Sequence, residues 1–223
     1  MIRTLLFTGH DSAYKPLADI TVPRMKAYAD KHGFDFRCYT EPLLDVPHGI
    51  YWTGVCGALE AFRDGYARVF YLDVDQLITN MDDELIANSF GFHASKDWGA
   101  DAIEPWQFSM CGFIATKDAL SLFETALEME PDWRDKPFPE QGPMQDIVKM
   151  MLHDLPHMVP NKEGLIGLIN IWPRSWVNCV PDEVCPGKVP EPWAPGDFAA
   201  HLTMLPIEER INLAHKLIKE HGI

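Results

Sequence analysis

Two aspartates, Asp73 and Asp75, follow the apolar run Val69–Leu72 and are separated by a single residue. Alternate residues of an extended segment point to the same side, so both carboxylates can face one site. Carboxylates this close repel each other unless a positive charge lies between or beside them. The spacing therefore predicts a divalent cation, and oxygen ligands of this kind suit Mg²⁺ or Mn²⁺. The alternative is that Asp75 starts a turn and Asp73 caps a neighbouring helix.

A third metal ligand is expected from histidine, and His201 is the best placed of the nine histidines. It ends the segment PWAPGDFAAH, in which Gly196 allows a tight turn and Phe198–Ala200 forms a short apolar strand. Such a strand would deliver His201 to a strand end. An imidazole added to two carboxylates favours Mn²⁺ over Mg²⁺. A partly buried histidine that bonds to the backbone is the alternative interpretation.

The length and composition indicate one globular domain over residues 1–223. Apolar residues make up 47% of the chain and charged residues 23%, which is ordinary for a protein with a packed core. The formal net charge of −14 arises from 33 acidic and 19 basic residues. A negative charge of this size disfavours nucleic acid and anionic membranes as partners.

The cysteines and the apolar segments indicate where the protein functions. Five widely spaced cysteines in a chain of this size favour reduced thiols, and Cys179 and Cys185 are the only pair close in sequence. The apolar stretch Leu5–Phe7 is too short for a signal peptide, and no later segment approaches the length of a membrane span. We therefore expect a soluble, cytoplasmic protein without an integral membrane segment.

The N-terminal half has the alternating pattern of the α/β class. Strands are expected at Ile2–Thr8, Phe34–Thr40 and Ala67–Asp75, and helices from the GHDS turn to about Lys31 and over Trp52–Arg63. Gly33 is expected to end the first helix. The strand that precedes the aspartates is apolar on both faces, as a central parallel strand must be.

The C-terminal half contains further elements of the same kind. We expect a strand at Phe108–Thr116, a helix from Lys117, a helix opened by Pro143, and a terminal helix from Pro206. Apolar residues follow the helical period in the helix after Pro143, at Met144, Ile147, Val148, Met151 and Leu152. The segment 161–195 is rich in proline, glycine and tryptophan, and we expect ordered irregular structure that covers other residues, because tryptophan is seldom left in solvent.

The segments VFYLDVDQLITN, PMQDIVKMM and WAPGDFAAHLT, in this order, resemble the metal-dependent GT-A glycosyltransferases. The likeness is greatest to the galactosyl/xylosyl/mannosyl-transferase family, whose patterns run as apolar-Asp-x-Asp, Gln-Asp and Gly-Asp-Phe-x-x-His. The segment MKAYADKHGFDF also resembles the first helix and second strand of that superfamily. The resemblance covers most of the chain. It implies a single GT-A domain with a mixed, mostly parallel central sheet flanked by helices.

The resemblance also implies roles for particular residues. Asp73, Asp75 and His201 would hold Mn²⁺ or Mg²⁺ against the diphosphate of a nucleotide-sugar. The other implied roles are a nucleotide contact for Thr8, a close approach to the donor sugar for Gly112, a contact with the transferred sugar or acceptor for Gln145 and Asp146, and diphosphate neutralisation for Arg210 or Lys216. A UDP-sugar is favoured as donor and a GDP-sugar is possible. The acceptor would be a sugar, glycan or other hydroxyl compound, and the closest family transfers with retention of configuration.

The chain departs from the family pattern at two positions, because Gly54 stands near the place of a basic residue and Met204 at the place of a glycine. Two other functions stay open. A phosphohydrolase of the haloacid dehalogenase type also places D-x-D after an apolar strand, but near the N-terminus and without Leu77 in its pattern. A non-catalytic sugar- or Ca²⁺-binding protein could use the acidic residues 82–84, which more simply form a helix's first turn capped by Asn80.

Overall fold

The computed structural model describes residues 2–84, 91–97, 107–154, 169–173, 176–186 and 192–223, and the statements below concern these residues. The strands are β1 (Thr4–Gly9), β2 (Asp35–Tyr39), β3 (Arg68–Leu72), β4 (Gln76–Ile78), β5 (Phe92–Lys96), β6 (Phe108–Thr116), β7 (Ile169–Trp172) and β8 (Ala199–His201). The helices are α1 (Lys15–His32), α2 (Thr53–Arg63), α3 (Leu120–Glu128), α4 (Glu130–Trp133), α5 (Gln141–Asp154) and α6 (Ile207–His221). Two short 3₁₀ helices are η1 (Gly49–Trp52) and η2 (Lys117–Ala119).

A six-stranded sheet forms the centre of the molecule, with the strand order β2-β1-β3-β6-β5-β7. Strand β1 is parallel to β2 and β3, and β5 is parallel to β7. Strand β6 is antiparallel to both β3 and β5. The α/β class and the mixed sheet predicted from the sequence are confirmed. The expectation of a parallel environment for β3 is correct only on its β1 side.

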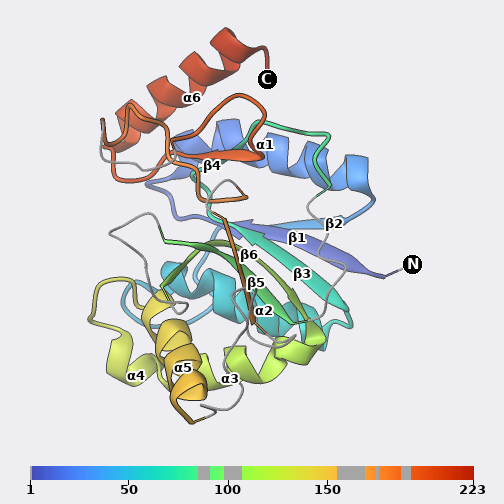
Figure 1. Cartoon of the computed structure of the whole chain (residues 1–223), viewed down its shortest axis with the longest axis vertical. Helices are drawn as coiled ribbons and strands as arrows, with labels where there is room; N and C mark the ends of the chain where they lie inside the picture. Colours follow the sequence, from blue (N-terminus) through green and yellow to red (C-terminus); the bar gives the residue numbers. More distant parts are fainter. Residues whose placement is uncertain (1, 85–90, 98–106, 155–168, 174–175, 187–191) are drawn as a thin grey trace.

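Helices cover both faces of the sheet (Figure 1). Helix α1 lies on one face, and helices α2, α3 and α5 lie on the other. Alternate strand residues supply the two cores: Leu6 and Phe70 pack with Tyr28 of α1, whereas Phe7 and Tyr71 belong to the cluster that includes α2. The small sheet of β4 and β8 lies beyond the end of β3, on the side of α1 and α6.

The helices follow the sequence signals closely. Helix α1 ends at Gly33, which has a φ of 71°, the left-handed conformation that glycine adopts readily. Helix α5 begins two residues before Pro143, and its predicted inward residues Met144, Ile147 and Val148 are buried. The terminal helix α6 buries Leu213, Ala214 and Leu217 against a third apolar cluster.

The segment 161–195 differs in part from its predicted irregular structure. Residues 169–172 form β7, a strand of four residues. The tryptophans pack as expected: the rings of Trp172 and Trp176 are 4.1 Å apart, and Trp193 Nε1 donates to Thr79 Oγ1 at 3.2 Å. Residues 161–168, 174–175 and 187–191 of this segment lie outside the described ranges. The helical turn expected at residues 82–84 does not form, although Asn80 Oδ1 accepts a hydrogen bond from the N–H of Asp82 at 3.1 Å, as a cap would.

Two further expectations concern thiols and membranes. All five cysteines are free, Cys179 and Cys185 included. Within the described ranges, no helix combines the length and the apolar composition that crossing a bilayer requires.

Candidate metal centre

The turn that leaves β3 fixes the two aspartates. The backbone N–H of Asp73 donates to Cys111 O on the neighbouring strand β6, at 2.8 Å. The N–H of Gln76 then donates to Asp73 O at 3.0 Å, which closes the turn into β4. Because β3 is buried on both faces, its end has little freedom to move. Both carboxylates are therefore placed by backbone hydrogen bonds.

Strand β8 brings His201 to the same place. In the β4–β8 pair, His201 lies opposite Gln76, and the N–H of Leu202 donates to Asp75 O at 2.9 Å. The N–H of His201 itself donates to Cys179 O at 2.7 Å. The contact between Asp75 and His201, which are 126 positions apart in sequence, thus depends on β4 and β8, two strands of three residues each.

Asp73, Asp75 and His201 form a group that fits a metal ion. One ligand atom from each lies within 4.8 Å of the others. Asp75 Oδ1 is 3.4 Å from His201 Nε2, and the two residues are only 7% and 5% exposed. Among the residues with a described placement, no other cluster of His, Cys, Asp and Glu has this spacing. The acidic residues 82–84 are therefore not a second site of this kind.

A hydrogen bond to Asn178 determines which ring nitrogen of His201 carries a proton. Asn178 Nδ2 donates to Lys96 O at 2.8 Å, which orients the amide so that Oδ1 faces His201 Nδ1 at 2.9 Å. An amide oxygen can only accept, so Nδ1 carries the proton and donates. In the neutral ring, Nε2 then presents its lone pair toward Asp75 Oδ1. This is the tautomer that a metal ligand needs, with a second residue holding the ring.

Arg210 supplies a positive charge within the site. Its Nη1 is 2.7 Å from Asp75 Oδ2, and its Nε donates to Leu205 O at 2.7 Å. The guanidinium also lies over the ring of Tyr14, 5.4 Å from the ring centre. Burial favours the neutral form of Asp75, but the charges of His201 and Arg210 outweigh this and lower the pKa of Asp75.

The other two acidic groups near Asp75, Asp73 and Glu140, have raised pKa values. Burial and then the charge of Asp75 raise the pKa of Asp73 to about 7. Burial and then the charge of Asp73 raise the pKa of Glu140 to about 8. The hydroxyl of Tyr71 donates to Asp73 Oδ1, and burial of this phenol raises its own pKa well above the usual value. Repulsion among buried carboxylates is the condition that a bound cation relieves.

The donor atoms suit a hard or borderline divalent ion. Asp75 Oδ1 is buried and has no hydrogen-bond partner, although a buried carboxylate oxygen normally has one. His201 Nε2 faces the same space, and it would offer its lone pair to a metal once the ring has lost the proton on Nε2. Two carboxylate oxygens and one imidazole nitrogen fit Mn²⁺ well and Mg²⁺ acceptably. The residues present therefore fit the ion that the sequence predicts.

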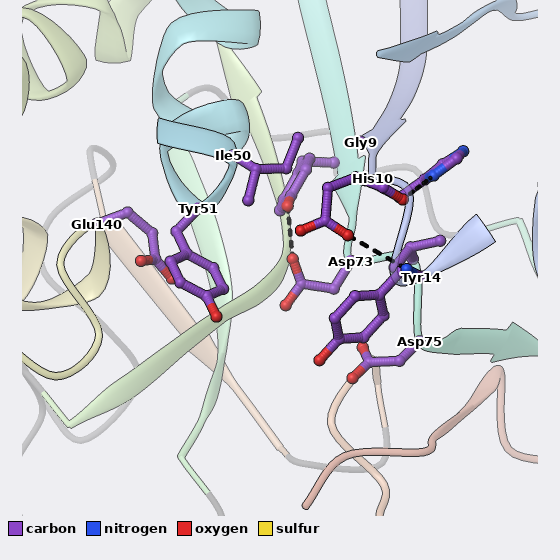
Figure 2. Close-up of a pocket in the computed structure, with 11 residues that line it drawn as sticks. Gly9, His10, Tyr14, Ile50, Tyr51, Asp73, Asp75 and Glu140 are labelled. Carbon is purple, nitrogen blue, oxygen red and sulfur yellow. Dashed lines mark hydrogen bonds between the residues drawn. The ribbon is translucent and has the colours of Figure 1, made fainter. Parts of the chain in front are cut away.

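The three residues lie in a cleft of ≈ 760 Å³. Its lining includes Arg210, Tyr14, Tyr51 and Glu140 as well as Asp73, Asp75 and His201. A smaller pocket of ≈ 110 Å³ adjoins the aspartates, and its lining includes Gly9, the last residue of β1, and His10 and Asp11, which follow the strand. Figure 2 shows Asp73 between Glu140 on one side and Tyr14, with Asp75, on the other.

Five other residues singled out from the sequence do not line this cleft or the smaller pocket: Thr8, Gly112, Gln145, Asp146, and Lys216, which pairs with Glu183 at 2.7 Å. Thr8 is fully buried, and the next three residues line the pocket instead. Gly112 lies against Leu72 and Val177, which a Cβ would approach to 3.1 Å. Gln145 Nε2 donates to Phe108 O at 2.7 Å, and its neighbour Asp146 is half-buried. Their functional roles stay predictions.

Sequence reasoning missed Glu140, Tyr71 and Asn178. Glu140 Oε2 is buried without a hydrogen-bond partner and its side chain lines both the cleft and the pocket. The signal available was an acid and an amide, Glu140 and Gln141, at the start of a helix after a proline-rich turn. Tyr71 could have been found from its position two residues before Asp73, on the same side of the strand. No local pattern marks Asn178.

The structure also explains one departure from the family pattern. Gly54 lies in α2, where a Cβ would approach the rings of Tyr71 and Phe113 to 3.2 Å. Any side chain at this position would therefore crowd these two rings. The cationic group in the cleft nearest to Asp75 is Arg210, from the other end of the chain.

Comparison with solved structures identifies the fold of the chain. No family model and no curated protein sequence matches the chain. A glycosyltransferase involved in the glycosylation of the major capsid of PBCV-1 is 16% identical, with a TM-score of 0.67 over 96% of this chain and 99% of that one. The galactosyltransferase LgtC, solved with donor and acceptor sugar analogues, is 12% identical, with a TM-score of 0.54 over 95% of each chain. The glycosyltransferase GlyE of Streptococcus pneumoniae TIGR4 is 11% identical, with a TM-score of 0.50 over 98% of this chain and 63% of that one. The predicted GT-A fold is thereby confirmed, and the narrower galactosyl/xylosyl/mannosyl-transferase family stays a prediction.

Proposed function

We propose that this protein is a metal-dependent glycosyltransferase that moves a sugar from a nucleotide-diphosphate sugar to a hydroxyl acceptor. The observation that carries the proposal is the convergence of Asp73, Asp75 and His201 in one cleft, at the end of a central strand. Ligands of open α/β sheets bind at such strand ends. In the reaction, the bond from the sugar's anomeric carbon to the diphosphate breaks, a bond to the acceptor oxygen forms, and the acceptor hydroxyl loses its proton.

In this proposal, Asp73, Asp75 and His201 hold Mn²⁺ or Mg²⁺. The bound ion would act as a Lewis acid toward the negative charge that grows on the leaving diphosphate. Asn178 holds the His201 ring in the tautomer that exposes Nε2. Arg210 lies beside Asp75 in the same cleft, so its guanidinium can neutralise part of the diphosphate charge.

We further propose that the nucleotide lies at the end of β1. The expected contact from Thr8 would then come through its neighbours, because Gly9, His10 and Asp11 line the pocket next to the aspartates. Tyr14 lines both the pocket and the cleft, and its ring offers an apolar face. A UDP-sugar remains the favoured donor, with a GDP-sugar as the other candidate.

Glu140 is the residue that we propose to contact the transferred sugar. It lines both the cleft and the smaller pocket next to Asp73, and one of its carboxylate oxygens has no hydrogen-bond partner. Gln145 and Asp146 were expected in this role, and the position of Gln145 supports an indirect one, because its amide holds Phe108 O on β6. Gly112 would contribute by letting the middle of β6 lie close to Leu72 at the end of β3. Transfer with retention of configuration is proposed from the sequence resemblance.

Isothermal titration with UDP, GDP and CDP, each with and without Mn²⁺, tests the proposal. A glycosyltransferase of this type should bind one nucleoside diphosphate tightly only when Mn²⁺ is present. Screening nucleotide-sugars for slow hydrolysis then identifies the donor. A phosphohydrolase would instead release phosphate from p-nitrophenyl phosphate, and a non-catalytic sugar-binding protein would bind sugars without any nucleotide. Either result, in the absence of metal-dependent nucleotide binding, would overturn the proposal.

A further inference from the structure

Strained backbone marks the rim of the cleft. Within the described part of the chain, the non-glycine residues with positive φ are His48 (58°), Phe138 (54°) and Met204 (63°). They belong to three separate segments, before η1, between α4 and α5, and between β8 and α6, yet all three line the same cleft. This conformation costs free energy for any residue with a Cβ, and such strain concentrates at binding sites.

Two of these positions carry exposed apolar side chains, and the third carries the exposed imidazole of His48. Phe138 is 65% exposed and Met204 is 62% exposed. Tyr51, which is 50% exposed, also lines the cleft, and its ring stacks on that of His48 with centres 5.9 Å apart and an interplanar angle of 28°. We call His48, Tyr51, Phe138 and Met204 the cleft rim. Side chains held in solvent by strained backbone do not serve core packing.

Carboxylates are among the polar groups that line the cleft. The cleft lining includes Asp97 and the exposed Asp135, besides the acidic residues of the metal centre. A sugar ring presents C–H groups on its faces and hydroxyls at its edge. The negative face of an aromatic ring attracts C–H groups, and carboxylates accept hydrogen bonds from hydroxyls. Aromatic rings interspersed with carboxylates therefore match a sugar better than a continuous alkyl chain.

The charged residues that line the cleft favour a neutral sugar over an anionic one. The acidic residues in its lining are Asp73, Asp75, Asp97, Asp135 and Glu140. The basic residues are Arg134, Lys136 and Arg210, of which Arg134 pairs with Glu130 and Arg210 with Asp75. Lys136 lies over the ring of Trp133 at 4.1 Å. Acidic residues outnumber basic residues in the lining, so an anionic acceptor would meet a surplus of negative charge.

We propose that the cleft rim is the acceptor subsite and binds a neutral sugar ring, with Tyr51 and Phe138 in contact with the ring faces. The proposal rests on the proposed function, because the bound ring is the acceptor of the transfer. Figure 2 shows Tyr51 on the same side of the pocket as Glu140 and across from Tyr14. A sugar on the rim therefore lies next to the space assigned to the donor.

Saturation-transfer NMR tests the proposal with the full chain, Mn²⁺ and UDP. The probes are methyl glycosides of glucose, galactose, mannose and xylose, with methyl glucuronide as the anionic comparison. At least one neutral glycoside should bind the wild-type protein, and methyl glucuronide should bind at least about tenfold more weakly. Phe138→Gly and Met204→Gly should each weaken the binding of the neutral glycoside by about tenfold or more. Met150→Ala is the matched control, because Met150 is 51% exposed on α5 and does not line the cleft.

The glycine variants separate a binding role from a structural one. Glycine adopts positive φ without strain, so the melting temperature of each variant should stay constant or rise by about 2–4 °C. A sugar-binding loss together with retained or increased stability supports the proposal. Equal glycoside binding by wild type and both glycine variants would overturn it, as would preferential binding of methyl glucuronide. Absence of glycoside binding, in a sample that binds UDP with Mn²⁺, overturns this inference alone. A sample that binds none of UDP, GDP and CDP in the presence of Mn²⁺ overturns the proposed function.

Discussion

Replacement of Arg210 by methionine is expected to lower the free energy of unfolding of the metal-free protein and to tighten its binding of Mn²⁺. The guanidinium lies 2.7 Å from Asp75 Oδ2, and the two side chains are only 12% and 10% exposed. Removing one member of a buried ion pair leaves an uncompensated charge and costs about 3–5 kcal/mol. Asp75 keeps His201 at 3.4 Å, so we expect the lower end of that range, about 3 kcal/mol.

Thermal unfolding in EDTA measures the first effect. For a chain of this length, a loss of about 3 kcal/mol corresponds to a melting temperature lower by roughly 6–12 °C. Lys216→Met is the matched control on the same helix. Lys216 pairs with Glu183 at 2.7 Å, but both side chains are nearly half exposed, and such pairs contribute about 0–1 kcal/mol.

Titration of Mn²⁺, followed by the electron paramagnetic resonance of the free ion, measures the second effect. Arg210 repels a cation at Asp75, so its removal should tighten Mn²⁺ binding without nucleotide by about tenfold, equivalent to about 1.4 kcal/mol. Mn²⁺ should then restore more stability to Arg210→Met than it adds to the wild type. Equal stability losses for the variants of Arg210 and Lys216, or weaker Mn²⁺ binding by Arg210→Met, would refute the reasoning.

Three further predictions concern residues around the metal centre. Asn178→Leu should weaken Mn²⁺ binding about 10–100-fold in the same titration, because His201 loses the partner that fixes its tautomer; an unchanged affinity would exclude that role. Glu140→Gln should lower the rate of sugar transfer by at least about tenfold, whereas Asp146→Asn should leave it within about twofold, and the reverse order would restore the role first expected for Asp146. Because the folded pKa of Glu140 is about 8 and its usual value is 4.5, the folded metal-free protein holds an extra proton between these values. Its unfolding free energy in urea should therefore fall as the pH rises from 5 to 8, by up to about 3.5 kcal/mol, and Glu140→Gln should flatten this dependence; an identical slope in the variant would contradict it.

The central part of the fold and the convergence of Asp73, Asp75 and His201 were accessible from sequence because their signals are local and strong. The run Val69–Leu72 is apolar on both faces, which requires a buried strand, and Asp73 and Asp75 then fall at its end. His201 was placed by a turn glycine and a three-residue strand, and the structure brings it within reach of both aspartates. Helix periodicity located the buried face of α5 for the same reason.

The rest of the site could not be read from local patterns. The direction of β6 depends on how the chain crosses the sheet, so the antiparallel pairing of β3 was not predictable from either strand. Asn178 acts through a hydrogen bond to His201, which is 23 residues away, and no periodicity marks such a contact. Glu140 reaches the cleft because α5 begins at Gln141, whereas the Gln-Asp pattern directed attention to Gln145 and Asp146, one turn later.

A crystal structure of the protein with Mn²⁺ and a nucleoside diphosphate, with data collected at the manganese absorption edge, tests the metal centre most directly. One anomalous peak is expected within about 2.0–2.3 Å of a carboxylate oxygen of Asp73, a carboxylate oxygen of Asp75 and Nε2 of His201. The same crystal of His201→Ala should show a weaker peak or none. A peak bound elsewhere on the chain, or full occupancy that does not involve His201, would contradict the proposed metal centre.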